Sequence, residues 1–243
     1  MATSIVENDT AAKFGNSPQK TGEPLDHAKL YSGKALEFDG VSDVITSGNN
    51  TLTNGFTAMT ISCWIYVEND TDSMIVSSKG SGASSGSIWT IFYESANNNM
   101  SLVTQPSSIT TDSAANSITL DTWHRLVVTV DYSAEEQKIY IDGVQSGSTG
   151  TLTDSALASD TTWDVSIGAK YKSNGSSIGQ YWDGKLSDYQ VWNTAWSSDD
   201  VTYDYLNPEK LITSNASVSG SQTTSNLKLW YPMNDTGVTN PQT

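Results

Sequence analysis

The chain has 243 residues, and 27 Asp and Glu against 12 Lys and Arg give it a formal net charge of −15. The basic residues form no cluster, which disfavours a nucleic-acid-binding surface. No apolar run approaches the roughly 18 residues that a membrane-spanning helix needs. The first ten residues lack the basic and apolar regions of a secretory signal. We therefore expect no nucleic-acid partner, no membrane partner and no export by that route.

The chain divides by its patterning into three parts. Residues 1–30 are polar and weakly periodic, and Pro18 and Pro24 interrupt any regular element. This part is either a flexible arm or an attachment segment that becomes ordered on a partner. Residues 31–206 carry the patterns of a folded domain, whereas residues 207–243 form a Ser-, Thr- and Asn-rich extension with one predicted strand at about 227–233.

Apolar and polar residues alternate in many short segments, which is the period of a half-buried strand. The clearest such segment is residues 59–67, and residues 120–147 predict a meander of three antiparallel strands. Asp142-Gly143 predicts a type I′ hairpin turn, because both central positions of that turn need positive φ. Residues 180–192 predict a strand pair that turns at Asp183-Gly184. Other strands are predicted at residues 35–38, 44–45, 74–78, 88–94, 100–105 and 163–169, with a Gly/Ser loop at residues 79–87.

One short helix is predicted near residues 197–206, because Ser197 suits an N-cap and Asp199 and Asp200 suit the helix dipole. Cys63 is the single cysteine and lies on the apolar side of its strand, so we interpret it as a buried structural thiol. These patterns predict an all-β fold, with two antiparallel sheets packed face to face and one short helix.

Five segments in order resemble the strands of concanavalin A-like, laminin-G-like domains. They are residues 35–44 (ALEFDGVSDV), 60–65 (TISCWI), 122–129 (TWHRLVVT), 139–143 (IYIDG) and 181–193 (YWDGKLSDYQVWN). The resemblance covers about residues 31–206 and implies a two-sheet antiparallel jelly roll. Residues 226–234 resemble the segment that follows such domains in large phage and marine bacterial surface proteins.

The resemblance raises the question of catalysis, because the family includes glycosidases. The glucanase relatives use Glu-x-Asp-x-x-Glu on one strand. The nearest match begins at Glu37 and Asp39, but Ser42 stands where the second Glu belongs. A hydrolytic triad needs a base, and His27 lies in the arm whereas His124 belongs to the family's ordinary strand motif. We predict that the protein is not an enzyme.

The resemblance also implies a structural Ca²⁺ between the opening and closing strands. Asp43 and Asp188 match the positions carried over from the family, and backbone carbonyls would complete the oxygen shell that Ca²⁺ selects. The alternative is that these carboxylates only cap turns. For carbohydrate binding, Trp89, Tyr93, Trp182 and Trp196 would stack on sugars if exposed. Sandwich cores also use aromatic residues, so we assign no ligand-binding residue.

The leading hypothesis is a non-enzymatic structural and interaction protein of a phage virion, such as a capsid decoration or a tail-fibre component. The N-terminal arm would attach the sandwich to other virion proteins, and the sandwich would contact host-surface glycans. A symmetric homo-oligomer fits this hypothesis. The alternative is a soluble carbohydrate-binding lectin module, extracellular or on a bacterial surface.

Overall fold

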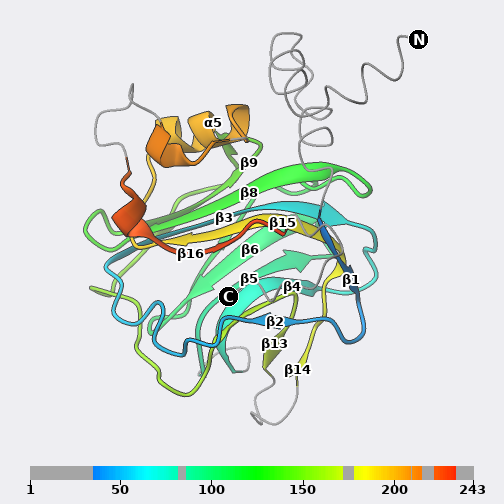
Figure 1. The fold of residues 1–243 in the computed structure, drawn as a ribbon, viewed down its shortest axis with the longest axis horizontal. Helices are drawn as coiled ribbons and strands as arrows, with labels where there is room; N and C mark the ends of the chain where they lie inside the picture. Colours follow the sequence, from blue (N-terminus) through cyan, green and yellow to red (C-terminus); the bar gives the residue numbers. More distant parts are fainter. Residues whose placement is uncertain (1–34, 82–85, 172–177, 209, 215–221, 234–243) are drawn as a thin grey trace.

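The computed structural model describes residues 35–81, 86–171, 178–208, 210–214 and 222–233. The predicted N-terminal arm, residues 1–30, lies outside the described residues. Two sheets of eight strands each pack face to face, and one α-helix lies on the outer face of one of them (Figure 1). Nearly every strand pair is antiparallel, so the predicted all-β sandwich is confirmed.

Sheet A places six strands in the order β1-β15-β3-β8-β9-β10, while β16 pairs with β15 and β11 pairs with β9. Its strands are β1 (Leu36–Asp39), β3 (Ala58–Val67), β8 (Trp123–Asp131), β9 (Glu136–Ile141), β10 (Val144–Gln145), β11 (Gly150–Thr151), β15 (Asp183–Trp192) and β16 (Leu227–Tyr231). Strands β1 and β16 pair with opposite halves of β15, so segments from the two ends of the domain lie along the same edge.

Sheet B follows the order β14-β13-β4-β5-β6-β7, and β12 pairs with both β4 and β2. Its strands are β2 (Ile45–Thr46), β4 (Met74–Ser81), β5 (Gly86–Glu94), β6 (Asn99–Thr104), β7 (Ile109–Asp112), β12 (Val165–Ile167), β13 (Lys170–Tyr171) and β14 (Ile178–Gly179). Strands β4 and β5 extend into the predicted Gly/Ser loop, and β7 lies where no strand was predicted.

The inner faces of the two sheets share one hydrophobic core, because alternate residues of each strand point to the same side. Strand β3 contributes Met59, Ile61 and Cys63, and each of these is at most 1% exposed. Burial raises the pKa of the Cys63 thiol to about 12, which keeps it in the unreactive protonated form. The prediction of a buried structural thiol is confirmed.

The Asp142-Gly143 turn is confirmed between β9 and β10, with φ of 52° and 82°. The predicted turn at Asp183-Gly184 is wrong, because both residues lie inside the continuous strand β15. Gly184 stands between neighbours on both sides, opposite Phe38 of β1 and Val67 of β3. A Cβ at Gly184 would lie 2.1 Å from the backbone oxygen of Tyr66. Glycine is required there by the close approach of two strands, and not by a turn.

Two elements near the C-terminus complete the fold. Helix α5 (Ser198–Leu206) lies where the sequence predicted a helix, with Ser197 and Asp200 forming a capping box. After the short 3₁₀ helices η1 (Ile212–Ser214) and η2 (Thr224–Asn226), β16 joins sheet A. Tyr231 and Met233 are buried in the core, so the strand predicted in the extension is an integral part of the sandwich.

Candidate functional site

Helix α5 covers the centre of the outer face of sheet A. Tyr205 of the helix packs on Trp64 and Trp123, and Val201 packs in a second apolar cluster with Trp192 and Trp196. The helix begins beside the last residues of β8 and the first residues of β9, where a cavity leaves the outer face of the sheet open.

A cavity of about 360 Å³ lies on this open part of sheet A, beside the start of helix α5. It is lined by Thr129, Asp131, Glu136, Lys138, Tyr140, Gln145, Ala195, Trp196, Ser197 and Ser198. We call this cavity the sheet A groove. Its volume falls in the range of roughly 300–1,000 Å³ that is usual for small-molecule sites.

The strand register explains why these side chains gather. Thr129 of β8 stands opposite Lys138 of β9, and Gln145 of β10 stands opposite Tyr140. All four point outward, because they alternate with inward residues such as Ile139. The segment 195–198 then closes one side of the groove from a distant part of the chain.

The groove combines an aromatic floor with a polar rim. Tyr140 and Trp196 are 4% and 3% exposed, whereas Gln145 and Ser198 are exposed. Lys138 forms an ion pair with Glu136, and this hydrogen-bonded carboxylate raises the pKa of Lys138. The groove therefore presents both hydrogen-bond donors and acceptors next to aromatic rings.

Two carboxylates, those of Asp131 and Glu136, stand opposite each other in the strand register at the groove. The Asp131 carboxylate accepts hydrogen bonds from the backbone of Ser133 at 2.9 Å and of Ala134 at 3.1 Å, so it caps the turn between β8 and β9. Glu136 is engaged by Lys138. Both carboxylates thus have structural partners.

A buried ion network lies beneath helix α5. Arg125 is 1% exposed, and its Nε and Nη2 donate to the two oxygens of Asp204 at 2.7 and 3.0 Å. Its Nη1 lies 3.0 Å from Oδ2 of Asp188, and Nη2 also donates to Ser62. Burial alone would lower the pKa of Arg125, but Asp204 and Asp188 outweigh it and the pKa is raised. The network fastens the helix to sheet A.

Asp188, one of the two predicted calcium ligands, belongs to this network. Burial raises the pKa of its carboxyl, while Arg125 opposes that change. Besides Arg125, its oxygens accept hydrogen bonds from Nε1 of Trp230 at 2.7 Å and from Nε2 of Gln190 at 2.9 Å. Donors therefore surround the carboxylate, and one of them carries a permanent positive charge.

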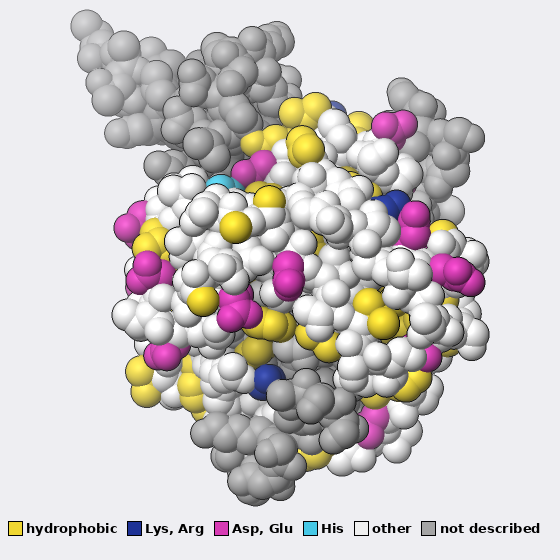
Figure 2. Space-filling view, turned by 180° about the vertical axis from the view of Figure 1, so that it is seen from behind, with side chains coloured by type: hydrophobic (Ala, Val, Ile, Leu, Met, Phe, Trp, Pro, Cys, Tyr) yellow, Lys and Arg dark blue, Asp and Glu magenta, His cyan; other side chains and the backbone are white. Residues whose placement is uncertain are grey.

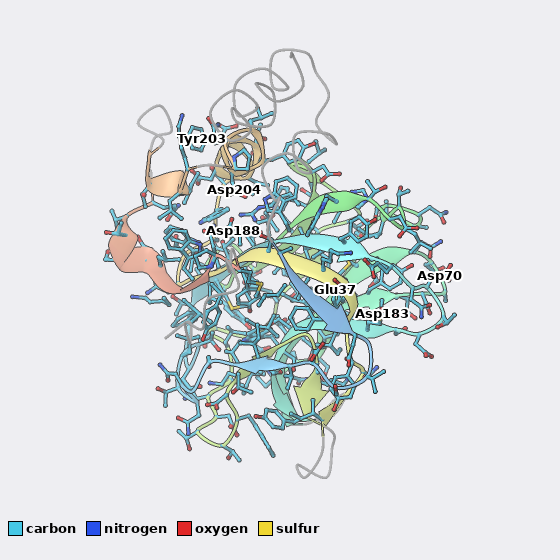
Figure 3. All side chains as sticks on the ribbon, turned by 45° about the vertical axis from the view of Figure 1, so that its right-hand side comes forward. Glu37, Asp70, Asp183, Asp188, Tyr203 and Asp204 are labelled. Carbon is cyan, nitrogen blue, oxygen red and sulfur yellow. The ribbon has the colours of Figure 1, made fainter. Side chains whose placement is uncertain are left out.

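Asp43, the other predicted ligand, lies in the turn after β1 and accepts a hydrogen bond from the Asp39 backbone at 3.0 Å. Strand β1 ends opposite Asp183, five residues before Asp188, which is about 17 Å along an extended strand. Figure 3 shows Asp188 close to Asp204 under the helix and Asp183 at a distance from both. The structure does not bring the two predicted ligands together.

The donor set does not fit a Ca²⁺ shared by Asp43 and Asp188, because a cation at Asp188 would adjoin the Arg125 guanidinium. Within the described ranges, no group of three or more His, Cys, Asp or Glu side chains is placed to hold a metal ion. The alternative interpretation, that these two carboxylates cap turns, fits Asp43, whose Oδ2 accepts a hydrogen bond from the Asp39 backbone at 3.0 Å, whereas Asp188 pairs with Arg125. In the same turn, Asp39 also acts as a cap. Its carboxylate accepts hydrogen bonds from the backbone of Ser42, Val41 and Asp43, which lowers its pKa to about 2.

The four aromatic candidates are buried. Trp89, Tyr93 and Trp182 are 0% exposed, and Trp196 reaches only the floor of the groove. Sequence reasoning missed Trp230, which is 44% exposed on β16. The signal was the alternation of Lys228 and Trp230 with apolar Leu229 and Tyr231, which marks an outward-facing aromatic residue.

Residues 39–202 match the model of the concanavalin A-like lectin/glucanases superfamily. The chain belongs to this superfamily. A comparison with curated proteins finds no match. Among the described residues, no helix is long and apolar enough to cross a membrane.

Several solved structures share the fold of this chain. A Bacteroides ovatus protein named for carbohydrate binding is 15% identical with a TM-score of 0.61, and the alignment covers 86% of this chain and 53% of that one. The chain thus spans about half the length of that protein. The CBM40 of a Ruminococcus gnavus sialidase, bound to α2,3 sialyllactose, is 14% identical with a TM-score of 0.56. That alignment covers 70% of this chain and 94% of the CBM40 chain. Tailspike protein 2 of Escherichia coli O157:H7 bacteriophage CAB120 is 12% identical with a TM-score of 0.53. That alignment covers 83% of this chain and 27% of the tailspike chain. At these identities, the likeness shows the fold.

His124 and Glu37 are two of the described residues that the question of catalysis raised, and each has a neighbour in the fold that accounts for it. Nδ1 of His124 lies 2.7 Å from Oδ2 of Asp142, and Nε2 accepts a hydrogen bond from the Thr119 backbone at 3.1 Å. The proton therefore sits on Nδ1, and both ring nitrogens have partners. Glu37 stands opposite Lys185 on the edge strand β1.

Proposed function

We propose that this member of the superfamily is a glycan-binding module that acts without catalysis, and that the sheet A groove is its binding site. One observation carries the proposal: a single cavity of about 360 Å³ has both an aromatic floor, formed by Tyr140 and Trp196, and a polar rim. Sugars expose both hydroxyl groups and apolar C–H faces, so they match a site of this mixed character.

The charge of the chain favours neutral glycans over acidic ones. The formal net charge is −15, and Figure 2 shows Asp and Glu side chains spread over one face of the molecule. In the groove, Glu136 neutralises Lys138. An acidic glycan would approach against a repulsive field that no free cation in the lining offsets.

A glycan array followed by isothermal titration tests this function. We expect the Lys138→Ala/Gln145→Ala variant to bind the best neutral glycan at least tenfold more weakly than the wild type. The matched control is Lys185→Ala, because Lys185 also pairs with a Glu on the outer face of sheet A and has a similar exposure, 33% against 25%. Its affinity should stay within twofold of wild type. Absence of binding to any glycan would overturn the proposed function.

A second candidate role is a place in a virion, where the sandwich would be presented by a capsid or a tail. The observation that favours it is the fold likeness to a segment of a phage tailspike. In this proposal, residues 1–30 attach the sandwich to other virion proteins. Mass spectrometry of purified particles is the test, and the absence of the chain from the particles would count against it.

A further inference from the structure

Trp230 differs from the other tryptophans of the chain. All eight lie in the described ranges, and seven are buried or half-buried, whereas Trp230 is 44% exposed. Lys228, two residues earlier on β16, is also exposed on the same side of the strand. The edge of sheet A thus presents an indole ring to solvent with a cation beside it.

The exposed ring is held in place from below. Its Nε1 donates to Oδ1 of Asp188 at 2.7 Å, and Oδ2 of Asp188 accepts from Arg125 at 3.0 Å. Arg125 is itself fixed by Asp204 of helix α5. An exposed aromatic side chain that has already lost its rotational freedom gives up less entropy when a ligand stacks on it. This indole is organised for stacking before any ligand arrives.

Trp230 and the groove lie on the same side of the same sheet. The register runs from Trp230 to Gln190 on β15, then through Ser62 and Val127 to Tyr140 on β9. Four inter-strand steps separate Trp230 from Tyr140, which is roughly 19 Å. Helix α5 packs on the sheet between them, so the two positions are separate points on the surface.

We propose that Trp230 is a second glycan contact, a platform on which the apolar face of a neutral sugar ring stacks, and that Asp188 is its positioning residue. This inference rests on the proposed function. Together the groove and Trp230 hold an extended neutral polysaccharide, or a surface coated with it, at two points. Binding at one point then raises the effective concentration of the polysaccharide at the other.

The test compares long and short ligands. Soluble β-glucan, galactomannan and dextran serve as polysaccharide probes, and disaccharides of the same linkages serve as short probes. We expect Trp230→Ala to weaken the binding of the preferred polysaccharide at least tenfold and to leave disaccharide affinity within twofold. Trp230→Phe keeps a ring but not the N–H group, so its polysaccharide affinity should fall between those of the wild type and Trp230→Ala. The matched control is Trp163→Ala, because Trp163 is a half-buried tryptophan outside the groove, with its ring centroid 4.8 Å from that of Tyr171.

Asp188 is tested by its conservative variant. Asp188→Asn keeps an oxygen that accepts from Trp230, so polysaccharide affinity should stay within threefold of wild type. Asp188→Ala should match Trp230→Ala on polysaccharide while disaccharide affinity persists, a split that a general loss of structure would not produce. Equal loss for both ligand lengths would overturn the assignment of Asp188.

The outcomes separate this inference from the proposed function. If the wild type binds neither polysaccharides nor disaccharides, the function itself fails, and the second contact fails with it. If the wild type binds polysaccharide and Trp230→Ala binds it equally well, the second contact is overturned while the groove stands.

Discussion

Two regions of the outer face of sheet A use charged residues in opposite ways. Beneath helix α5, the side chain of Arg125 is 1% exposed and contacts Asp204, Asp188 and Ser62. In the groove, the side chain of Lys138 is 25% exposed, and its ion pair within the described part of the chain is with Glu136. The two cations lie on neighbouring strands of one sheet, and both point outward by the same alternation.

Arg125 and Lys138 differ because helix α5 covers the first and leaves the second open to solvent. A charge that is removed from water must find partners for its hydrogen-bonding groups, so the covered region became a closed network. A charge at an open rim keeps part of its water, so its ion pair contributes little to stability. We therefore expect changes under the helix to alter stability, and changes in the groove to alter binding.

The largest expected effect is that of Arg125→Met. The variant keeps much of the side-chain volume but leaves the buried Asp204 and the half-buried Asp188 without their cation, so we expect a loss of about 3–5 kcal/mol in the free energy of unfolding. Urea denaturation measures it. Lys138→Ala, the matched change in the open region, should cost less than about 0.5 kcal/mol because its ion pair is partly exposed. Equal effects of the two variants would contradict the contrast between covered and open regions.

A smaller effect is expected at Gly143, where helix α5 meets the β9–β10 turn. Its φ is +82°, and an added Cβ would lie 3.0 Å from Cδ1 of Tyr205 on the helix. Gly48 is the matched control, because its φ is +65° and an added Cβ would meet nothing within 4 Å. We expect Gly48→Ala to cost about 1 kcal/mol from backbone strain, and Gly143→Ala about 2–3 kcal/mol. Equal costs would show that the helix yields readily to the added methyl group.

Local patterns predicted the features that depend on neighbouring residues. Alternation located β3, Asp142-Gly143 located a hairpin, and Ser197 located the start of α5. These signals are local because strand period, turn φ and helix capping are set within a few residues.

The candidate sites depend on contacts between distant segments, and no local pattern records those. The groove joins β8 and β9 to the segment 195–198, and Asp188 meets Arg125 from 63 residues away. Asp188 carries the same carboxylate whether it faces a cation or binds one, so its sequence position alone could not decide its role. Gly184 likewise looked like a turn, because a strand that needs close approach and a turn both select glycine.

A pH-dependent effect is expected at the exposed turn after β1. The pKa of Asp39 is lowered from 3.8 to about 2 by hydrogen bonds from the backbone of Ser42 and Val41. The folded state therefore binds this proton less readily than the unfolded state, so the contribution is present above pH 4 and is lost as the pH falls toward 2. Wild type should exceed Asp39→Ala in urea midpoint at pH 7, and the gap should close near pH 2. A gap that stays constant over this range would show that the charge of Asp39 has no role.

The smallest expected effect is that of calcium. The carboxylate of Asp188 is turned toward Arg125, Trp230 and Gln190, so a Ca²⁺ there would have to displace a buried cation and its hydrogen bonds. A ligand stabilises a fold only in proportion to its binding, so millimolar Ca²⁺ should shift the melting temperature by less than about 1 °C relative to a chelator. A saturable rise of several degrees would contradict this expectation. Asp43→Ala and Asp188→Asn would then locate the ion, because only the first touches the exposed turn where carboxylate and carbonyl oxygens lie free of the Arg125 network.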